Sequence, residues 1–250
     1  MAGGDVVLLV VAGFACGAVN AMAGGGSLIL FPAMVATGMG TLAANVTNSV
    51  ATWPGYWGSA YGFRAELGSM RHRPGRLAVA TAAGSLVGCV LLLATPTEAF
   101  DAVVPVLVLA AAALLAVQPA LVRRIGEPRE GHRATERAQL AAVFLACIYG
   151  GYFGAALGVI LLGVLSLTVA EPLRRLNGLK AGLSVVDATV SVVVFGLFGP
   201  VRWVAVAIAA PAALVGGYAG ARVARRVDDV LLRWAVVAFA VAAAAYLALR

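Results

Sequence analysis

Two ionisable residues, Lys180 and Asp187, lie deep inside an apolar segment that spans residues 177–197. An ionisable side chain at membrane depth is costly and usually marks a functional site. With 3.6 residues per helical turn, Lys180, Ser184, Asp187 and Ser191 share one face, and Lys180 and Asp187 are about 10 Å apart along the axis. We expect Lys180 and Ser184 to bind an anionic substrate and Asp187 to couple a proton. The alternatives are a Lys180 ammonium that snorkels to the surface and an Asp187 held in a structural hydrogen bond.

A second unusual feature is the run Gly24, Gly25, Gly26 and Ser27, which interrupts an apolar stretch over residues 6–35. Non-helical backbone at membrane depth survives only beside protein or a water-filled cavity, and broken helices of this kind form substrate sites in secondary transporters. We expect Ser27 to cap a short helix whose N–H groups and dipole attract an anion, with Asn20 just before the break. The alternative is that the glycines only permit close helix packing.

Polar residues also gather in the third apolar segment, where Asn45 and Asn48, and likewise Asn48 and Thr52, share a helical face. Some of these side chains could serve only to bond neighbouring helices. The expected substrate-binding residues are Asn20, Gly24, Gly25, Gly26, Ser27, Asn45, Thr47, Asn48, Asn177, Lys180 and Ser184, with Asp187 as the proton-coupling residue.

Enzymatic and metal chemistry find no support in the sequence. His72 and His132 lie in polar loops, and Cys16, Cys89 and Cys147 are dispersed in apolar segments without metal-ligand spacing. The chain has no Walker motif. We therefore expect neither an enzyme nor a bound cofactor or metal, and we expect the cysteines to act as small buried apolar residues.

These residues are set in a strongly hydrophobic chain of 250 residues, of which 62% are hydrophobic and 12% charged, with a mean hydropathy of +0.97. Soluble domains carry roughly twice that charged fraction. We expect an all-α polytopic membrane protein with about 8–10 transmembrane or half-helical segments. Ten can be drawn: 5–23, 27–40, 43–62, 77–95, 102–122, 138–156, 158–170, 177–197, 203–221 and 230–249. The segments 27–40 and 158–170 are too short to span comfortably and are expected to be the return arms of broken helices.

Loop charges predict the orientation. Arginines fill the loops at 64–76, 123–137 and 222–226, whereas Glu98 and Asp101 mark the loop between the fourth and fifth segments. The positive-inside rule puts the basic loops in the cytoplasm and both termini outside, in a bacterial cytoplasmic membrane. The same rule places the glycine break at the inner corner of the first half. Because the basic residues lie in these loops, we do not expect the net charge of +7 to bind nucleic acid.

This topology gives two halves of opposite orientation. We expect a first transmembrane repeat over residues 1–122, a basic cytoplasmic linker over 123–137 and an inverted second repeat over 138–250. Asn45 aligns with Asn177, and Gly24 aligns with Gly158. Inverted repeats with matching broken helices are typical of alternating-access carriers.

The chain resembles the TauE/SafE sulfite exporter family, also called TSUP, of bacterial transporters. The resemblance rests on the segments 20–32 (NAMAGGGSLILFP), 44–49 (ANVTNS), 150–158 (GGYFGAALG), 176–180 (LNGLK) and 199–203 (GPVRW). It implies an inverted-repeat carrier that moves small anions such as sulfite, sulfoacetate or organosulfonates. Many relatives have Lys where this chain has Ser49, and the second break lacks the family's glycine cluster. The first departure places more weight on Lys180 as the cation for an anionic substrate.

We therefore expect a secondary transporter of a small anion (sulfite, an organosulfonate or an organic acid) that works by alternating access with proton coupling. The expected partners are this anion and the lipid bilayer, with a homodimer as an open alternative. A passive anion channel and a membrane subunit of a larger complex also stay open.

Overall fold

The computed structural model describes residues 3–68, 75–125, 136–169, 171–223 and 229–248. Every regular element in these ranges is a helix, which confirms the all-α prediction. The helices are α1 (Gly3–Met22), α2 (Ser27–Ala36), α3 (Thr41–Gly62), α4 (Arg64–Gly68), α5 (Gly75–Ala94), α6 (Thr97–Ile125), α7 (Glu136–Tyr152), α8 (Leu157–Thr168), α9 (Leu173–Phe198), α10 (Trp203–Val223) and α11 (Asp229–Ala248). Each of the ten expected segments corresponds to one helix, and the short α4 is an addition. Most of the expected linker, residues 126–135, lies outside the described ranges.

Five of the described helices are long and apolar enough to cross a membrane, namely α1, α5, α9, α10 and the part of α6 up to Val117. The helices α2 and α8 are shorter, as expected for the return arms of broken helices. The protein is therefore a multi-pass membrane protein.

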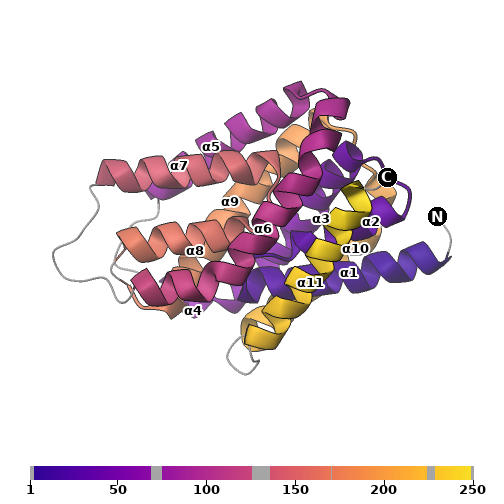
Figure 1. The fold of residues 1–250 in the computed structure, drawn as a ribbon. Coiled ribbons are helices and arrows are strands. Elements are labelled where there is room, and N and C mark those ends of the chain that lie inside the picture. The colour runs from indigo at the N-terminus through magenta and orange to yellow at the C-terminus, as the bar shows by residue number, and fades with distance from the viewer. Residues whose placement is uncertain (1–2, 69–74, 126–135, 170, 224–228, 249–250) are drawn as a thin grey trace.

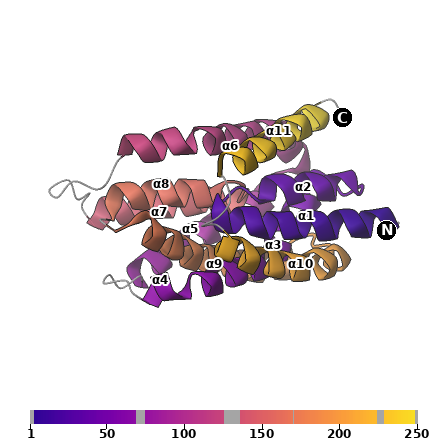
Figure 2. The ribbon, with the colours of Figure 1, turned by 90° about the horizontal axis from the view of Figure 1, so that it is seen from below.

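The bundle is built around two long central helices, α3 and α9, which pack against each other. Helix α10 packs against α1 and α3, and α5 packs against α7 and α9. Small residues permit these approaches: a Cβ on Gly17 of α1 would collide with the Ala213 carbonyl oxygen of α10. Both termini lie at one end of the bundle in both ribbon views (Figures 1 and 2).

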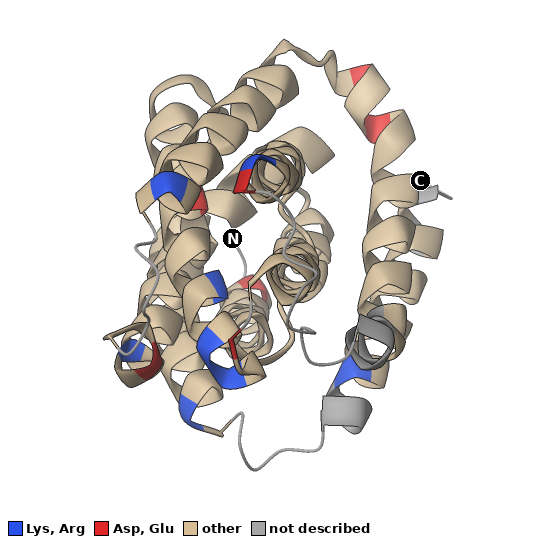
Figure 3. Cartoon of the chain, turned by 90° about the vertical axis from the view of Figure 1, so that its left-hand side faces the viewer, with Lys and Arg blue, Asp and Glu red and all other residues tan. Residues whose placement is uncertain are grey.

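The opposite end of the bundle carries most of the described basic residues, and we call it the basic end (Figure 3). There α3 ends, α9 begins and α10 ends, with Arg64, Arg174 and Arg222 at these helix termini. Glu98 and Asp101 instead lie in the first turns of α6, at the end that holds the termini. The loop arginines at 71, 73, 129, 133, 225 and 226, which also entered the orientation argument, lie outside the described residues.

Candidate functional site

The two helix breaks meet in the middle of the bundle. A Cβ on Gly24 would lie 2.7 Å from the Cα of Gly158, and a Cβ on Gly158 would lie 2.7 Å from the Cα of Gly24. The predicted location of the first break at the inner corner is therefore wrong, because α1 and α7 enter from opposite ends and both stop at the same central level (Figure 1). Gly24 also has a φ of +89°, a conformation that glycine adopts without cost.

The start of α2 differs from the sequence expectation. Gly26 occupies the N-cap position and is already helical, with φ −62° and ψ −30°, so Ser27 falls in the first turn and does not cap the helix. Asn20 Oδ1 accepts a hydrogen bond from the Gly26 N–H at 2.8 Å. The Leu28 N–H donates to the carbonyl of Gly25. Several of the N–H groups that we expected to attract an anion thus already have protein partners.

The three glycines of the first break have different surroundings. A Cβ on Gly26 would collide with the carbonyl oxygen of Cys16, so close packing accounts for this glycine. A Cβ on Gly25 would meet only the side chain of Leu115, with the nearest atom at 2.9 Å. Gly24 alone combines a left-handed conformation with contact to the second break. The packing alternative therefore explains part of the glycine run.

The second break is formed without a glycine cluster. Gly154 has a φ of +73°, and Ala156, directly before α8, has a φ of +62°. A left-handed conformation costs a non-glycine residue roughly 1–2 kcal/mol. The Tyr149 hydroxyl donates to the Ala155 carbonyl oxygen at 2.7 Å and braces this turn. Tertiary contacts thus stabilise a left-handed backbone conformation that glycine residues would adopt without cost.

Each central helix supplies a side chain to the interrupted helix of the other half. Asn45 of α3 donates through Nδ2 to the carbonyl oxygen of Tyr152, the last residue of α7, at 3.0 Å. Lys180 of α9 donates through Nζ to the carbonyl oxygen of Ala21, near the end of α1, at 3.4 Å. Donors and cations are favourable at helix C-termini, where carbonyl groups lack intrahelical partners. Lys180 is only 1% exposed, so the snorkelling alternative is wrong.

A small, mostly buried cavity lies between the two breaks, halfway along α3 and α9. Its volume is about 10 Å³, which is room for one water molecule. Both breaks and both central helices contribute to its wall: Ser27, Asn48, Ser49, Thr52, Tyr56, Gly150, Gly154, Asp187, Ala188 and Ser191. The wall is therefore mainly hydroxyl and amide groups, with one carboxyl.

Asp187 is the acidic group of this cavity and is 5% exposed. Its Oδ1 accepts a hydrogen bond from the hydroxyl of Ser85 on α5. A Cβ on Gly150 of α7 would lie 2.7 Å from the same oxygen, so this glycine makes room for the carboxyl group. Cys89 Sγ and Ser191 Oγ lie 3.5 Å apart on the same side of α9. The structural hydrogen bond that was the alternative for Asp187 exists, and the carboxyl group also borders the cavity.

Asn48 gives the cavity unused hydrogen-bonding capacity. The residue is 1% exposed, and its Oδ1 has no partner among the described residues. A buried polar atom without a partner is costly unless water or a ligand satisfies it. Asn48 is therefore suited to contact whatever occupies the cavity.

Of the expected site residues, Ser27, Asn48 and Asp187 line this cavity. Thr47 instead accepts a hydrogen bond from the Arg202 N–H at 3.0 Å, between α3 and the corner before α10. Asn177 Nδ2 donates a hydrogen bond to the carbonyl oxygen of Leu173 in its own helix, at 3.1 Å. The remaining expected residues, Asn20, Gly24, Gly25, Gly26, Asn45, Lys180 and Ser184, are described but do not line the cavity.

Three residues at or beside the cavity were not predicted from the sequence as site residues: Thr52, Tyr56 and Ser85. Thr52 and Tyr56 follow Asn48 at intervals of four residues on one helical face, so this spacing was a usable signal. Ser85 offered no comparable signal, because its role depends on α5 packing against α9. The three cysteines are free and buried, as expected. Within the described ranges, no three His, Cys, Asp or Glu side chains are grouped to hold a metal ion.

Comparison with known proteins assigns the family. The family model described as sulfite exporter TauE/SafE matches residues 9–247. A probable membrane transporter protein, ORF9 of Sinorhizobium sp., is 30% identical over 159 residues, which cover 61% of this chain and 58% of that relative. The matched region thus spans less than two thirds of the relative's length, and no solved structure matches the chain. Both matches are to membrane transporters rather than enzymes. The chain belongs to the sulfite exporter TauE/SafE family.

Proposed function

We propose that the protein is a secondary transporter that carries a small anion across the membrane by alternating access. The observation that supports this most directly is the small polar cavity between two helix breaks, with walls from both halves of the chain. A binding site at this depth, bordered by both breaks, is what a carrier needs in order to expose one site to each side of the membrane in turn. Sulfite, an organosulfonate or an organic acid are the substrates we propose, in line with the family's description.

We further propose that residues 1–122 and 138–250 form two inverted repeats joined by the linker 123–137. The packing supports this proposal, because replacing each helix by its equivalent in the other half converts observed helix contacts into other observed helix contacts. The pair α1–α10 corresponds to α7–α5, and α2–α11 corresponds to α8–α6. The pairs α3–α9 and α6–α11 each correspond to themselves. Such symmetry lets one set of contacts open as the equivalent set closes.

Electrostatics support proton coupling at Asp187. Among the described residues that line the cavity, none is a Lys or Arg that could balance an anion, and Asp187 is the only acidic or basic one. An anion 4 Å from an ionised carboxylate is repelled by about 4 kcal/mol at an effective dielectric constant of about 20. That repulsion corresponds to roughly a thousand-fold loss of affinity. The anion therefore enters when Asp187 carries a proton, and the two cross the membrane together.

The test is anion flux into proteoliposomes at several pH values, with labelled sulfite as the probe. Asp187→Asn keeps the shape of the side chain but cannot exchange a proton. We expect its flux to lose both the pH dependence and the ability to be driven by a proton gradient. Glu98→Gln, in the exposed first turn of α6, is the matched control and should behave as the wild type. Unchanged proton-driven flux in Asp187→Asn would remove the coupling role.

Counterflow separates a carrier from the channel alternative. Unlabelled sulfite inside the vesicles should accelerate uptake of labelled sulfite through a carrier, whereas a passive channel shows no such acceleration. We also propose that the basic end faces the cytoplasm of a bacterial cell, in accordance with the positive-inside rule. The homodimer stays a prediction.

A further inference from the structure

A second cavity, about 680 Å³ in volume, opens at the basic end of the bundle. Among the described residues, three arginines and one glutamate line it: Arg64, Arg174, Arg222 and Glu66. Small residues at the ends of α3 and α10 and in α4 complete the wall. We call this cavity the arginine vestibule; the basic end, at which it opens, faces the viewer in Figure 3.

Two of the arginines are held by aromatic rings. The guanidinium of Arg64 lies 4.5 Å from the ring centre of Tyr61 and donates to the Tyr61 carbonyl oxygen at 3.1 Å. The guanidinium of Arg222 lies 4.6 Å from the ring centre of Tyr218. The two tyrosine rings contact each other, with centres 5.8 Å apart. The stack fixes the two cations beside one cavity, and a planar guanidinium suits an oxyanion.

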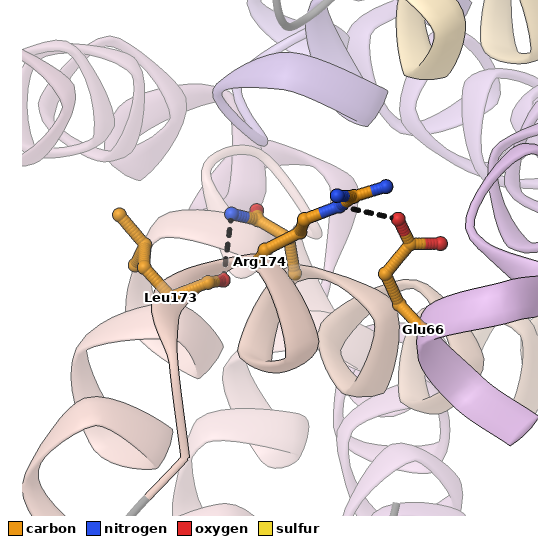
Figure 4. A network of polar contacts seen from close by, with 4 residues as sticks. Glu66, Leu173 and Arg174 are labelled. Atoms are coloured by element: carbon orange, nitrogen blue, oxygen red, sulfur yellow. Dashed lines mark hydrogen bonds and ion pairs between the residues drawn. The ribbon is translucent and has the colours of Figure 1, made fainter. Parts of the chain in front are cut away.

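The third arginine links the two halves of the chain. Arg174 Nε donates to Glu66 Oε1 at 2.6 Å, which joins the start of α9 to α4 (Figure 4). The Arg174 side chain is 59% exposed, whereas the Glu66 side chain is only 9% exposed, so the two residues stay paired because breaking the pair would leave a largely buried carboxylate. The exposed part of the Arg174 guanidinium can still contact an incoming anion. With three arginines and one glutamate, the vestibule favours negative charge.

A cluster of buried apolar residues, which we call the apolar layer, lies along the helices between the residues of the vestibule and those of the central cavity. It consists of Ala21, Phe63, Ala181 and Ala221. Phe63 directly precedes Arg64 of the vestibule, and Ala221 directly precedes Arg222. Along α9, Ala181 lies between Arg174 and Asp187, which are about 20 Å apart by helical rise. The order from the basic end inward is thus arginine vestibule, apolar layer, central cavity.

We propose that the arginine vestibule is a first binding site for the transported oxyanion, separate from the central site and used when the anion arrives from the basic end. The substrate class in this inference rests on the proposed function. The vestibule is wide enough for a hydrated anion, whereas the central cavity has room for one water molecule. Arg64 and Arg222 bind the anion, Arg174 adds its positive charge while it stays paired with Glu66, and Phe63 blocks further entry until the halves move.

Equilibrium binding to the purified protein tests the site without requiring transport. The probe is sulfite, titrated by calorimetry in a neutral detergent. We expect the double variant Arg64→Gln/Arg222→Gln to bind sulfite at least tenfold more weakly, whereas Arg76→Gln, an exposed arginine paired with Glu136 outside the vestibule, binds as the wild type. A parallel titration with phosphatidylglycerol distinguishes a lipid headgroup from a free anion. Binding of the lipid but not of sulfite would overturn the proposal.

Transport from each side provides the second test. The protein is inserted into vesicles in each of its two orientations. In the double variant, the KM for sulfite should rise about tenfold when sulfite is supplied on the side of the basic end, and it should be unchanged when sulfite is supplied on the other side. Arg202→Gln, at the opposite end, is the control for a general charge effect. Normal flux with an unchanged KM from the basic end would refute the vestibule alone. Absence of flux in the wild type would refute the proposed function, and the calorimetric result would still decide the vestibule.

Discussion

The contact between Gly24 and Gly158 allows a graded prediction for three glycine-to-alanine variants. Gly24→Ala places a side chain at a φ of +89°, which costs roughly 1–2 kcal/mol. It also places Cβ 2.7 Å from the Gly158 backbone, and such overpacking costs about 1–3 kcal/mol. Together the free energy of unfolding should fall by about 2–5 kcal/mol.

The other two variants separate these two costs. Gly158→Ala meets the same backbone contact without a positive φ, so it should cost about 1–3 kcal/mol. Gly25→Ala meets only the movable side chain of Leu115, so it should cost less than about 1 kcal/mol. Gly25 is the matched control, because it lies next to Gly24 in the same break.

The assay is denaturant unfolding of the purified protein in detergent micelles, followed by tryptophan fluorescence, with sulfite flux as the second readout. The expected order of destabilisation is Gly24→Ala, then Gly158→Ala, then Gly25→Ala, and flux should be lost first in Gly24→Ala. Because Gly24 and Gly158 are in contact, the double variant should be non-additive. Equal stability of Gly24→Ala and Gly25→Ala would refute the inference that the two breaks touch.

Three further predictions concern the residues that hold the breaks and the helix corners. Asn20→Ala removes the acceptor for the Gly26 N–H and should destabilise the protein by about 1–3 kcal/mol, measured by the same unfolding assay. Thr47→Val removes the acceptor for the Arg202 N–H, at the end of the bundle opposite the basic end, and should lower the free energy of unfolding by about 1–3 kcal/mol. Thr47→Ser keeps the hydroxyl group and should retain most of the wild-type stability. Ala156→Gly removes the cost of holding an alanine in a left-handed conformation, but it also loses a buried methyl group worth about 0.8 kcal/mol. The free energy of unfolding should therefore stay within about 1 kcal/mol of the wild-type value. A fall in the free energy of unfolding well above about 1 kcal/mol would show that Ala156 is not strained.

The sequence predicted the helices well because membrane segments are encoded by local composition. The interruption at Gly24–Ser27 and the short apolar run beginning at Leu157 indicated two half-length helices, and both are present. The local detail was less reliable. Ser27 has the chemistry of an N-cap, but Gly26 takes that position because the backbone turns helical one residue earlier.

Burial of Asp187 was also predictable, since it lies in the middle of an apolar segment, whereas the sequence left open whether the Lys180 ammonium reaches the surface. The hydrogen-bond partners of the two side chains were not predictable. Lys180 lies against the end of α1 and Asp187 accepts from Ser85 of α5, although both residues share one face of α9. Helical spacing places residues on a face, but it carries no information about which helix that face will meet.

The sequence by itself therefore determined that this is a multi-pass helical membrane protein, with two broken helices and two ionisable residues inside one apolar segment. Those properties depend on hydrophobicity, backbone freedom and spacing within single segments. Only the tertiary structure decided that Gly24 touches Gly158, that Asn48 and Asp187 border one small cavity, and that three arginines line another. Each of these contacts joins residues from helices far apart in the chain, and packing alone sets which helices become neighbours.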